Sequence, residues 1–365
     1  TLFAISSDPE ASYSSVNLIY KFDIDKDKTS LNAFRNGLIF NLYNSMLGNR
    51  LEELTKSAEP PFLFAHSSKG SWVQSKQMYT LSAYVKTNGI PKGMEVLVRE
   101  SIRLQKYGFT ETELNRQKTK LLRGLEKSFN EKDKTESDSY KWDYKNHYLE
   151  GDAIPSIDFT FNKAAELIPD ISLDDVNTLS TELIRNTNRV ITASSPENEG
   201  IAIPTEDELS EIFNTVLQSS IDPYIDVVLN EPLVTSLHPA GKVVSEKYIE
   251  SLELTEWSLA NGVQVVLKPT NFKNDEILFY AHSVGGHSLV NNADYIAATT
   301  SSKIIIESGI GNFSKIELEK LLADKLVNIS PWIESLSEGF RGSVSPKDQE
   351  TLFQLIYQYF NAPRL

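Results

Sequence analysis

A hairpin signature deep inside this chain limits how the chain can be divided into sheets. In the segment WSLANGVQVVLKP, from Trp257 to Pro269, apolar residues alternate on both sides of Asn261-Gly262. An Asn-Gly pair between two alternating runs is the strongest short-range signal for a β-hairpin, and a proline typically ends a strand. We therefore expect a new sheet to open in the last third of this 365-residue chain.

The region before the hairpin has the composition of a linker. Residues 201–250 contain one short helical pattern, from Glu206 to Leu217, and no sustained alternation typical of a strand. Prolines recur through this region, and a proline-rich stretch does not build a continuous core. These prolines are Pro204, Pro223, Pro232 and Pro239.

Length, charge and cysteine content narrow the class of protein. A chain of 365 residues exceeds what one core usually covers, so two domains are expected. The net charge of −14, without clustered Lys or Arg, argues against nucleic acid or an anionic membrane as the main partner. The chain has no cysteine, which excludes disulfides, thiolate nucleophiles and cysteine-bound zinc but leaves the compartment open.

Neither a membrane span nor a signal peptide is visible in the sequence. No stretch approaches the ~18 apolar residues of a transmembrane helix. The first residues, TLFAISSDPEASYSS, have neither a basic start nor an apolar run. Any signal peptide would have to lie upstream of Thr1.

The first 200 residues alternate between strand and helix patterns and predict an α+β fold. Thr29 or Ser30 is placed to cap a long helix with an apolar stripe, which Gly48 interrupts. Thr110 and Glu113 match a capping box at the start of a charged helix over 111–132. The other expected elements are strands over 16–24, 62–66, 78–84 and 189–194, and helices over 90–104 and 172–185.

The chain's own motifs identify no catalytic chemistry. His282 and His287 are expected on opposite faces of one strand without a third ligand, which argues against a metal site. The GIGNFS run at Gly309 lacks the third glycine of a dinucleotide loop, and a helix entry turn capped by Ser314 explains it better. The remaining histidines are isolated, and no G-x-S-x-G or paired carboxylates stand out. They are His66, His147 and His238.

Several longer phrases, taken together, resemble the pitrilysin/insulinase family of inverted zinc metallopeptidases. The long helix ends in NRLEELTKSAEPPF, and the hairpin is followed by DEILFYAHSVGGHSLV and by GSVSPKDQETLFQLIYQYFNAPR, the most family-specific phrase. Long members of this family contain four similar α/β-roll domains in two halves. The resemblance covers nearly the whole chain. It implies an internal segment of a long bacterial member, with mostly antiparallel sheets packed on helices.

The resemblance also implies a domain organisation. Residues 1–200 are similar to the family's second domain, an α/β roll, and 201–250 to the linker with its short helix. Residues 251–365 resemble the opening of the third domain, truncated at Leu365. In the first domain of the family, absent here, an H-x-x-E-H helix binds zinc and its Glu acts as general base.

The third-domain counterpart of that helix is expected in YIAATTSSKIII, starting at Tyr295. Aligning it with the family motif puts Ala298, Ser301 and Ser302 where His, Glu and His would stand. Ala298 cannot bind a metal and Ser302 is a poor zinc ligand, so the resemblance implies no catalytic residue and no metal site here. Zinc is expected only in the first domain of the parent. The helix is expected to be structural, with Ile296, Thr299 or Thr300, and Lys303 with Ile304, packing on the sheet.

The function implied by the resemblance is therefore indirect. We expect a non-catalytic portion of a zinc-dependent peptidase that forms part of the chamber for peptide substrates. The expected partners are the peptide and the companion N- and C-terminal domains of the parent, which is periplasmic or exported if it carries a signal peptide. The alternative is a parent without catalysis, an assembly or peptide-binding homologue of the same family.

Overall fold

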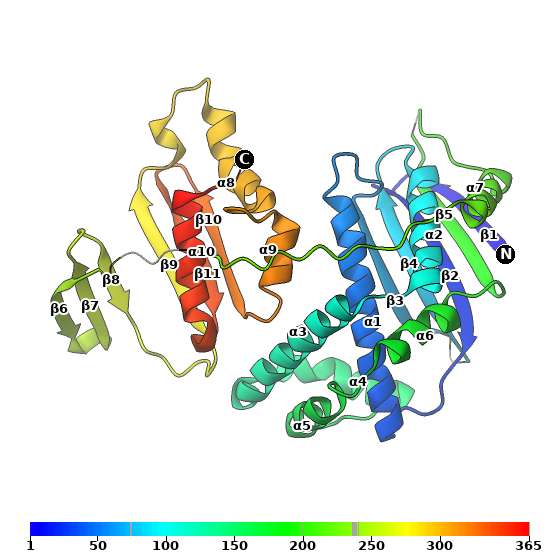
Figure 1. The fold of residues 1–365 in the computed structure, drawn as a ribbon, viewed down its shortest axis with the longest axis horizontal. Coiled ribbons are helices and arrows are strands. Elements are labelled where there is room, and N and C mark those ends of the chain that lie inside the picture. Colours follow the sequence, from blue (N-terminus) through cyan, green and yellow to red (C-terminus); the bar gives the residue numbers. More distant parts are fainter. Residues whose placement is uncertain (74, 199, 236–238, 240, 365) are drawn as a thin grey trace. The chain divides into compact units, whose positions relative to one another are not determined.

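The computed structural model describes residues 1–365 except 74, 199, 236–238, 240 and 365. It separates into two compact units (Figure 1). Unit 1 comprises Thr1–Leu122 and Lys141–Val227, and unit 2 comprises Arg123–Tyr140 and Val228–Leu365. The two units are defined by their internal contacts, which do not show whether each folds on its own. The expected domain limits of 1–200, 201–250 and 251–365 therefore stay predictions.

Unit 1 is built on a five-stranded sheet in the order β1-β5-β2-β4-β3. All neighbouring strands are antiparallel except β1 and β5, which are parallel. Four strands were predicted, whereas β1 was missed. The strands are β1 (Leu2–Asp8), β2 (Ser14–Asp23), β3 (Phe64–Val73), β4 (Lys76–Val85) and β5 (Arg189–Pro196).

The long helix α1 (Leu31–Thr55) packs against this sheet. Ser30 is its N-cap and accepts a hydrogen bond from the Ala33 backbone, as predicted. The expected interruption at Gly48 is wrong, because α1 continues through it. A glycine inside a helix costs only about 1 kcal/mol, and the buried side chains on either side of Gly48 offset that cost. Those side chains include Met46, Leu47, Arg50 and Leu51.

The described part of unit 1 has six other α-helices, of which the two over 141–150 and 157–167 were not predicted. They are α2 (Ile90–Tyr107), the start of α3 (Glu111–Asn130), α4 (Lys141–Glu150), α5 (Ile157–Leu167), α6 (Leu173–Leu183) and α7 (Glu206–Gln218). The capping box is confirmed, since Thr110 Oγ1 accepts from the Glu113 amide and Glu113 accepts from the Thr110 amide. Glu113 also forms a buried two-pronged ion pair with Arg50 of α1, at 2.7 and 2.8 Å.

The start of the expected linker packs on unit 1. Helix α7 lies along α2 and buries Leu209, Phe213 and Val216. Farther along, Asp226 accepts two hydrogen bonds of 3.0 Å from Arg116. Residues up to Val227 therefore share contacts with unit 1 although their proline-rich composition is typical of a linker.

Unit 2 contains two three-stranded antiparallel sheets. One has the order β10-β11-β9, from β9 (Ile277–Val284), β10 (Val327–Ile333) and β11 (Ser337–Val344). The other has the order β6-β7-β8 and contains the predicted hairpin as β7 (Leu254–Leu259) and β8 (Gln264–Leu267). Strand β6 (Val243–Ile249) was missed, since it lies where no strand was expected.

The helices of unit 2 are α8 (Tyr295–Ser308), α9 (Lys315–Leu321) and α10 (Gln349–Asn361). Its apolar core joins α9 and α10 to the β10-β11-β9 sheet, with Phe340, Val344 and Leu352 at its centre. The last turns of α3 also belong to unit 2. There Arg123 donates to Asp348 at 2.8 Å, and Glu131 accepts from the Asn274 backbone at 2.8 Å.

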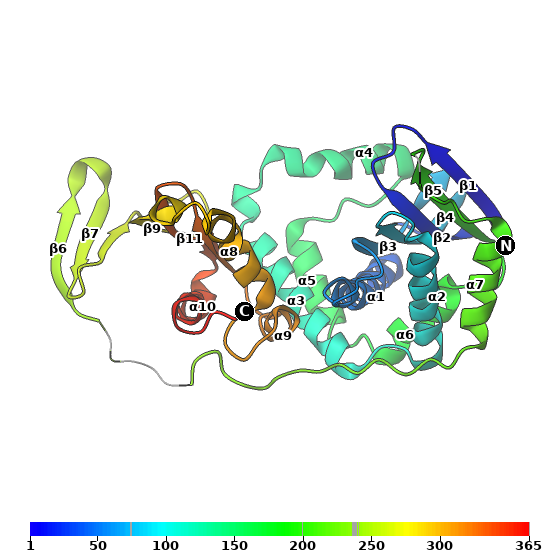
Figure 2. The same cartoon turned by 90° about the horizontal axis from the view of Figure 1, so that it is seen from above.

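The two units repeat one topology. In unit 1, strand β2 leads through α1 to the hairpin β3-β4 and then to α2, and in the sheet β4 lies between β2 and β3. In unit 2, strand β9 leads through α8 and α9 to the hairpin β10-β11 and then to α10, and β11 lies between β9 and β10. Helix α8 is therefore the counterpart of α1, and each contacts the edge strand that follows it. Figure 2 shows α1 beside its edge strand β3.

Within the described part of the chain, no helix is long and apolar enough to cross a membrane.

Candidate functional site

Helix α8 contains the three positions at which zinc ligands would stand. None of its side chains is fully buried, and Ala298, Ser301 and Ser302 lie on its half-buried side. The Ser301 hydroxyl donates to the Ala298 carbonyl oxygen at 2.9 Å, so it is engaged with its own helix. A methyl group and two neutral hydroxyls do not form a zinc-binding set. The residues present do not fit the metal.

The expected packing of α8 is wrong in its details. Ile296 is 70% exposed and Ile304 is 52% exposed, so neither forms a buried stripe on the sheet. The half-buried residues near the end of the helix are instead Ile305 and Ile306. The pattern of residues in α8 is apolar on several sides, and periodicity alone did not identify the side that meets β10.

A cavity of about 720 Å³ lies between α8 and the β10-β11-β9 sheet. Ser302 is the position of the degenerate motif that lines it, one turn from Thr299 and Ile306. Lys303 of α8 and Arg341 of β11 also line the cavity, and neither forms an ion pair within the described part of the chain. The cavity therefore has two free cationic groups in its wall. Sequence reasoning missed it because its residues come from four separate elements.

The cavity wall also contains a buried polar atom without a partner. Trp332 of β10 is buried, and its indole Nε1–H finds no acceptor among the described residues. The Trp332 ring stacks on Tyr280 of β9, with ring centroids 5.6 Å apart. A buried donor without an acceptor costs about 1–3 kcal/mol, and such groups are uncommon in proteins.

The histidines do not converge on a metal site. His282 lies in β9, but the strand ends before His287, which lies in a 3-10 turn over Gly286–Leu289. The expectation that both share one strand on opposite faces is therefore wrong. His287 packs edge-on against Tyr295, with ring centroids 5.1 Å apart.

The other two histidines that the structure describes are separate as well. His66 stacks on Phe64 in β3, and His147 Nδ1 lies 2.7 Å from the Asp152 carbonyl oxygen. His238 lies outside the described residues. Among the residues that the structure describes, no three His, Asp or Glu side chains are grouped so that they could hold a metal ion.

The glycine run at Gly309 is a helix entry turn, as predicted. Ser314 caps α9 and forms a capping box with Glu317. Gly309 has a φ of 96°, and a Cβ there would lie 2.2 Å from the Phe313 carbonyl oxygen. This glycine is therefore required by the tight turn.

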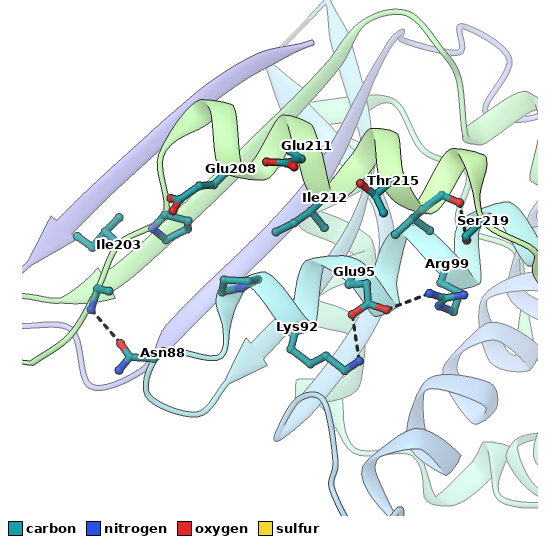
Figure 3. A pocket seen from close by; sticks show the side chains of 14 residues that line it. Asn88, Lys92, Glu95, Arg99, Ile203, Glu208, Glu211, Ile212, Thr215 and Ser219 are labelled. Atoms are coloured by element: carbon teal, nitrogen blue, oxygen red, sulfur yellow. Dashed lines mark hydrogen bonds and ion pairs between the residues drawn. The ribbon is translucent and has the colours of Figure 1, made fainter.

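Unit 1 has a second concave site, a groove of about 700 Å³ between α2 and α7 (Figure 3). Glu95 lies along it and pairs with Lys92 and Arg99, at 3.0 Å each. Burial alone would raise the pKa of Glu95, but these two cations outweigh it and hold the pKa below its ordinary value. Glu208 and Glu211 also line the groove, so its carboxylates outnumber its two cations. Its geometry contains no nucleophile paired with a base.

Comparison with known proteins adds evidence on ancestry. No protein-family model matches the chain. The "Zinc protease PQQL-like" protein of Arabidopsis thaliana is 25% identical over 350 residues, which cover 96% of this chain and 33% of that protein. PqqL of Haemophilus influenzae, described as a probable zinc protease, is 20% identical over 337 residues, which cover 92% of this chain and 36% of that protein. The chain thus spans about a third of the length of the curated relatives it matches.

Solved structures with the same fold are proteases. The periplasmic protease PqqL of Escherichia coli superposes with a TM-score of 0.58 at 17% identity, over 99% of this chain and 40% of that one. Pitrilysin superposes with a TM-score of 0.59 at 14% identity, over 98% of this chain and 37% of that one. Ferredoxin protease FusC, solved as an E83A mutant with Arabidopsis ferredoxin, gives 0.59 at 18% identity, over 100% and 41%.

These likenesses extend over nearly the whole chain. The structural matches confirm the α+β fold with mostly antiparallel sheets. The sequence matches are to proteins described as zinc proteases, and they include both repeats of the strand-helix-hairpin topology. The chain is similar to zinc proteases over nearly its whole length, and these matches support the pitrilysin/insulinase family.

Proposed function

We propose that this chain is a non-catalytic portion of a zinc-dependent peptidase and helps to wall the chamber that holds the peptide. The observation that carries the proposal is helix α8. It occupies the place of α1 in the repeated topology, yet Ala298, Ser301 and Ser302 supply no zinc-binding set on it. Zinc and the general base would then come from a first domain elsewhere in the parent protein.

Exposed apolar side chains support the proposed partners. The β9 strand of unit 2 exposes Leu278, Tyr280 and Val284, by 78%, 67% and 84%. Contiguous exposed apolar residues are typical of surfaces that bind other protein. Companion domains of the parent and the peptide substrate are the partners that we propose for such surfaces. Because one structural relative is a periplasmic protease, we also propose a periplasmic or exported location.

The proposal is tested by comparing this chain with the longer protein that contains it. Both are assayed against a mixture of quenched fluorescent peptides, before and after treatment with a chelator and after zinc is restored. We expect the longer protein to lose activity with the chelator and regain it with zinc, while this chain stays inert throughout. Hydrolysis by this chain alone would overturn the proposal.

The alternative is a parent without catalysis, which would serve in assembly or in peptide binding. In that case the longer protein would also be inert with zinc. An H-x-x-E-H motif in the preceding domain, within about 200 residues, separates the two cases at once, since only a catalytic parent requires it.

A further inference from the structure

The space between the helix and the sheet is filled by side chains in unit 1, whereas in unit 2 a cavity lies there. Helix α1 buries eight side chains, among them Leu42, Tyr43 and Leu47. Helix α8 buries none, and the space between it and the sheet is a cavity of about 720 Å³. A concave space of this size, lined by apolar side chains and a few polar and charged ones, is typical of a binding site.

The wall of the cavity offers more donors than the protein itself uses. Lys303 and Arg341 form no ion pair among the described residues. The side chains of Ser302, Asn328, Ser330 and Ser343 likewise make no hydrogen bond in the described part of the chain. All of these residues line the cavity.

These donors match a carboxylate better than other anions. Arginine pairs with carboxylates through two parallel hydrogen bonds, and lysine adds a point charge. Nucleic acid would need a larger basic cluster, whereas only two cations line this cavity and Glu334 lies beside them. Leu278, Ile306 and Trp332 provide apolar surface next to the cations, which suits the side chains of a peptide.

We propose that the cavity between α8 and the β10-β11-β9 sheet binds a carboxylate of an acidic peptide segment, held by Arg341 and Lys303. This assignment rests on the proposed function, because it specifies which part of a peptide this portion of the chamber holds. The chain carries a net charge of −14, which repels acidic peptides in general. Binding of an acidic peptide therefore requires local recognition.

The test measures binding of fluorescent Gly-Ser-Glu repeat peptides to the full 365-residue chain by fluorescence anisotropy at low salt. A Gly-Ser-Gln repeat of equal length removes the acidic side chains, and C-terminal amidation of each peptide removes the terminal carboxylate. We expect the Glu peptide to bind about tenfold more tightly than the amidated Gln peptide. Comparing the two single changes shows whether the side chain or the terminus supplies the carboxylate.

Two variants and one control locate the site. Arg341→Gln and Lys303→Gln change exposed side chains, so both should fold, as circular dichroism and melting will check. Each should reduce the preference for the carboxylate peptides by about five- to tenfold. Lys106→Gln removes an exposed lysine of α2 and should leave binding unchanged.

The outcomes separate this inference from the proposed function. If all peptides bind equally, or if Arg341→Gln and Lys303→Gln leave the carboxylate preference intact, the assignment of this cavity is wrong while peptide holding stands. If no peptide binds at all, both the cavity assignment and peptide holding by this chain fail.

Discussion

Helices α1 and α8 occupy the same place in two copies of one topology, but α1 buries side chains against its sheet and α8 buries none. Helix α1 fills the space above its sheet with large side chains and carries the buried ion pair between Arg50 and Glu113. Helix α8 leaves a cavity of mixed apolar and polar lining next to its sheet and exposes Ile296 and Ile304. The shared topology therefore fixes where a helix lies but not whether that helix builds a core or a site.

The difference can be traced to residue choice. Helix α1 places Leu38, Leu42, Met46 and Leu47 at three- and four-residue spacing, which buries one stripe. In α8 the corresponding side is built from Ala298, Ser301 and Ser302, which are too small to fill the space. The unit 2 core is formed without α8, by α9, α10 and the sheet.

Truncating one apolar side chain in each helix should show the largest contrast. Leu47→Ala removes a side chain that is 1% exposed and should lower the free energy of unfolding by about 2–5 kcal/mol, because it leaves a cavity in unit 1. Ile304→Ala on α8 is the matched control and should stay within about 0.5 kcal/mol of wild type. Hydrogen exchange read by mass spectrometry resolves the two units. If both substitutions lowered the free energy of unfolding equally, α1 and α8 would not differ in how they pack.

A buried carboxylate, Asp348, is expected to contribute to the stability of unit 2, as the buried side chains of α1 do in unit 1. Asp348 is 6% exposed and accepts hydrogen bonds of 2.8 Å from Arg123 and from the Leu326 backbone. Asp348→Asn should lower the free energy of unfolding of unit 2 by about 1.5–3 kcal/mol, since it weakens hydrogen bonds to a charged group.

The control for Asp348 is an exposed ion pair in unit 1, between Lys163 and Glu166. Glu166→Gln should cost less than about 1 kcal/mol, because exposed pairs contribute little. Denaturant titration of both variants measures the two effects. Equal costs would mean that the Asp348 contact does not hold unit 2 together.

Acid should weaken unit 2 through Asp275. Burial alone would raise the pKa of this carboxyl, but hydrogen bonds from Ser345 and Asn130 outweigh it and lower the pKa below its ordinary value. The folded state thus favours the ionised form, so this stability is present above the unfolded pKa and is lost as pH falls through the folded pKa, below about pH 4. Asp275→Asn should show a smaller loss of melting temperature than wild type between about pH 5 and pH 3. An unchanged pH profile in the variant would contradict this role.

The smallest effect is expected at the degenerate motif itself. Ser301 donates only to the Ala298 carbonyl of its own helix, so Ser301→Ala should change the free energy of unfolding by less than about 0.5 kcal/mol. Thermal melting measures this, and peptidase activity of the longer protein should also be unchanged. A loss of activity at an unaltered melting temperature would show that α8 contains a functional residue.

Local signals in the sequence predicted local structure well. Ser30, the Thr110 and Glu113 pair, and Ser314 were all identified as caps, because a cap depends on residues within one helical turn. Strands β1 and β6 and helices α4 and α5 were missed. The residues of β6 are nearly all exposed and include Glu and Lys, so they lack the alternation that marks a half-buried strand.

The site could be predicted only in part. The absence of ligand chemistry at Ala298, Ser301 and Ser302 follows from residue type, once the helix is located. The cavity does not, because Lys303 of α8 and Arg341 of β11 lie far apart in the sequence and are brought to one cavity by the fold. The side of α8 that meets β10 is likewise decided by long-range packing, which explains the error at Ile304.

The most direct test of whether this chain contributes a zinc site to the peptidase is its zinc content. The purified 365-residue chain, free of tags, is dialysed against zinc and analysed for metal by mass spectrometry, alongside a His282→Ala, His287→Ala double variant. We predict far less than one zinc per chain, with no difference between the two proteins. One zinc per chain, lost in the double variant, would contradict it.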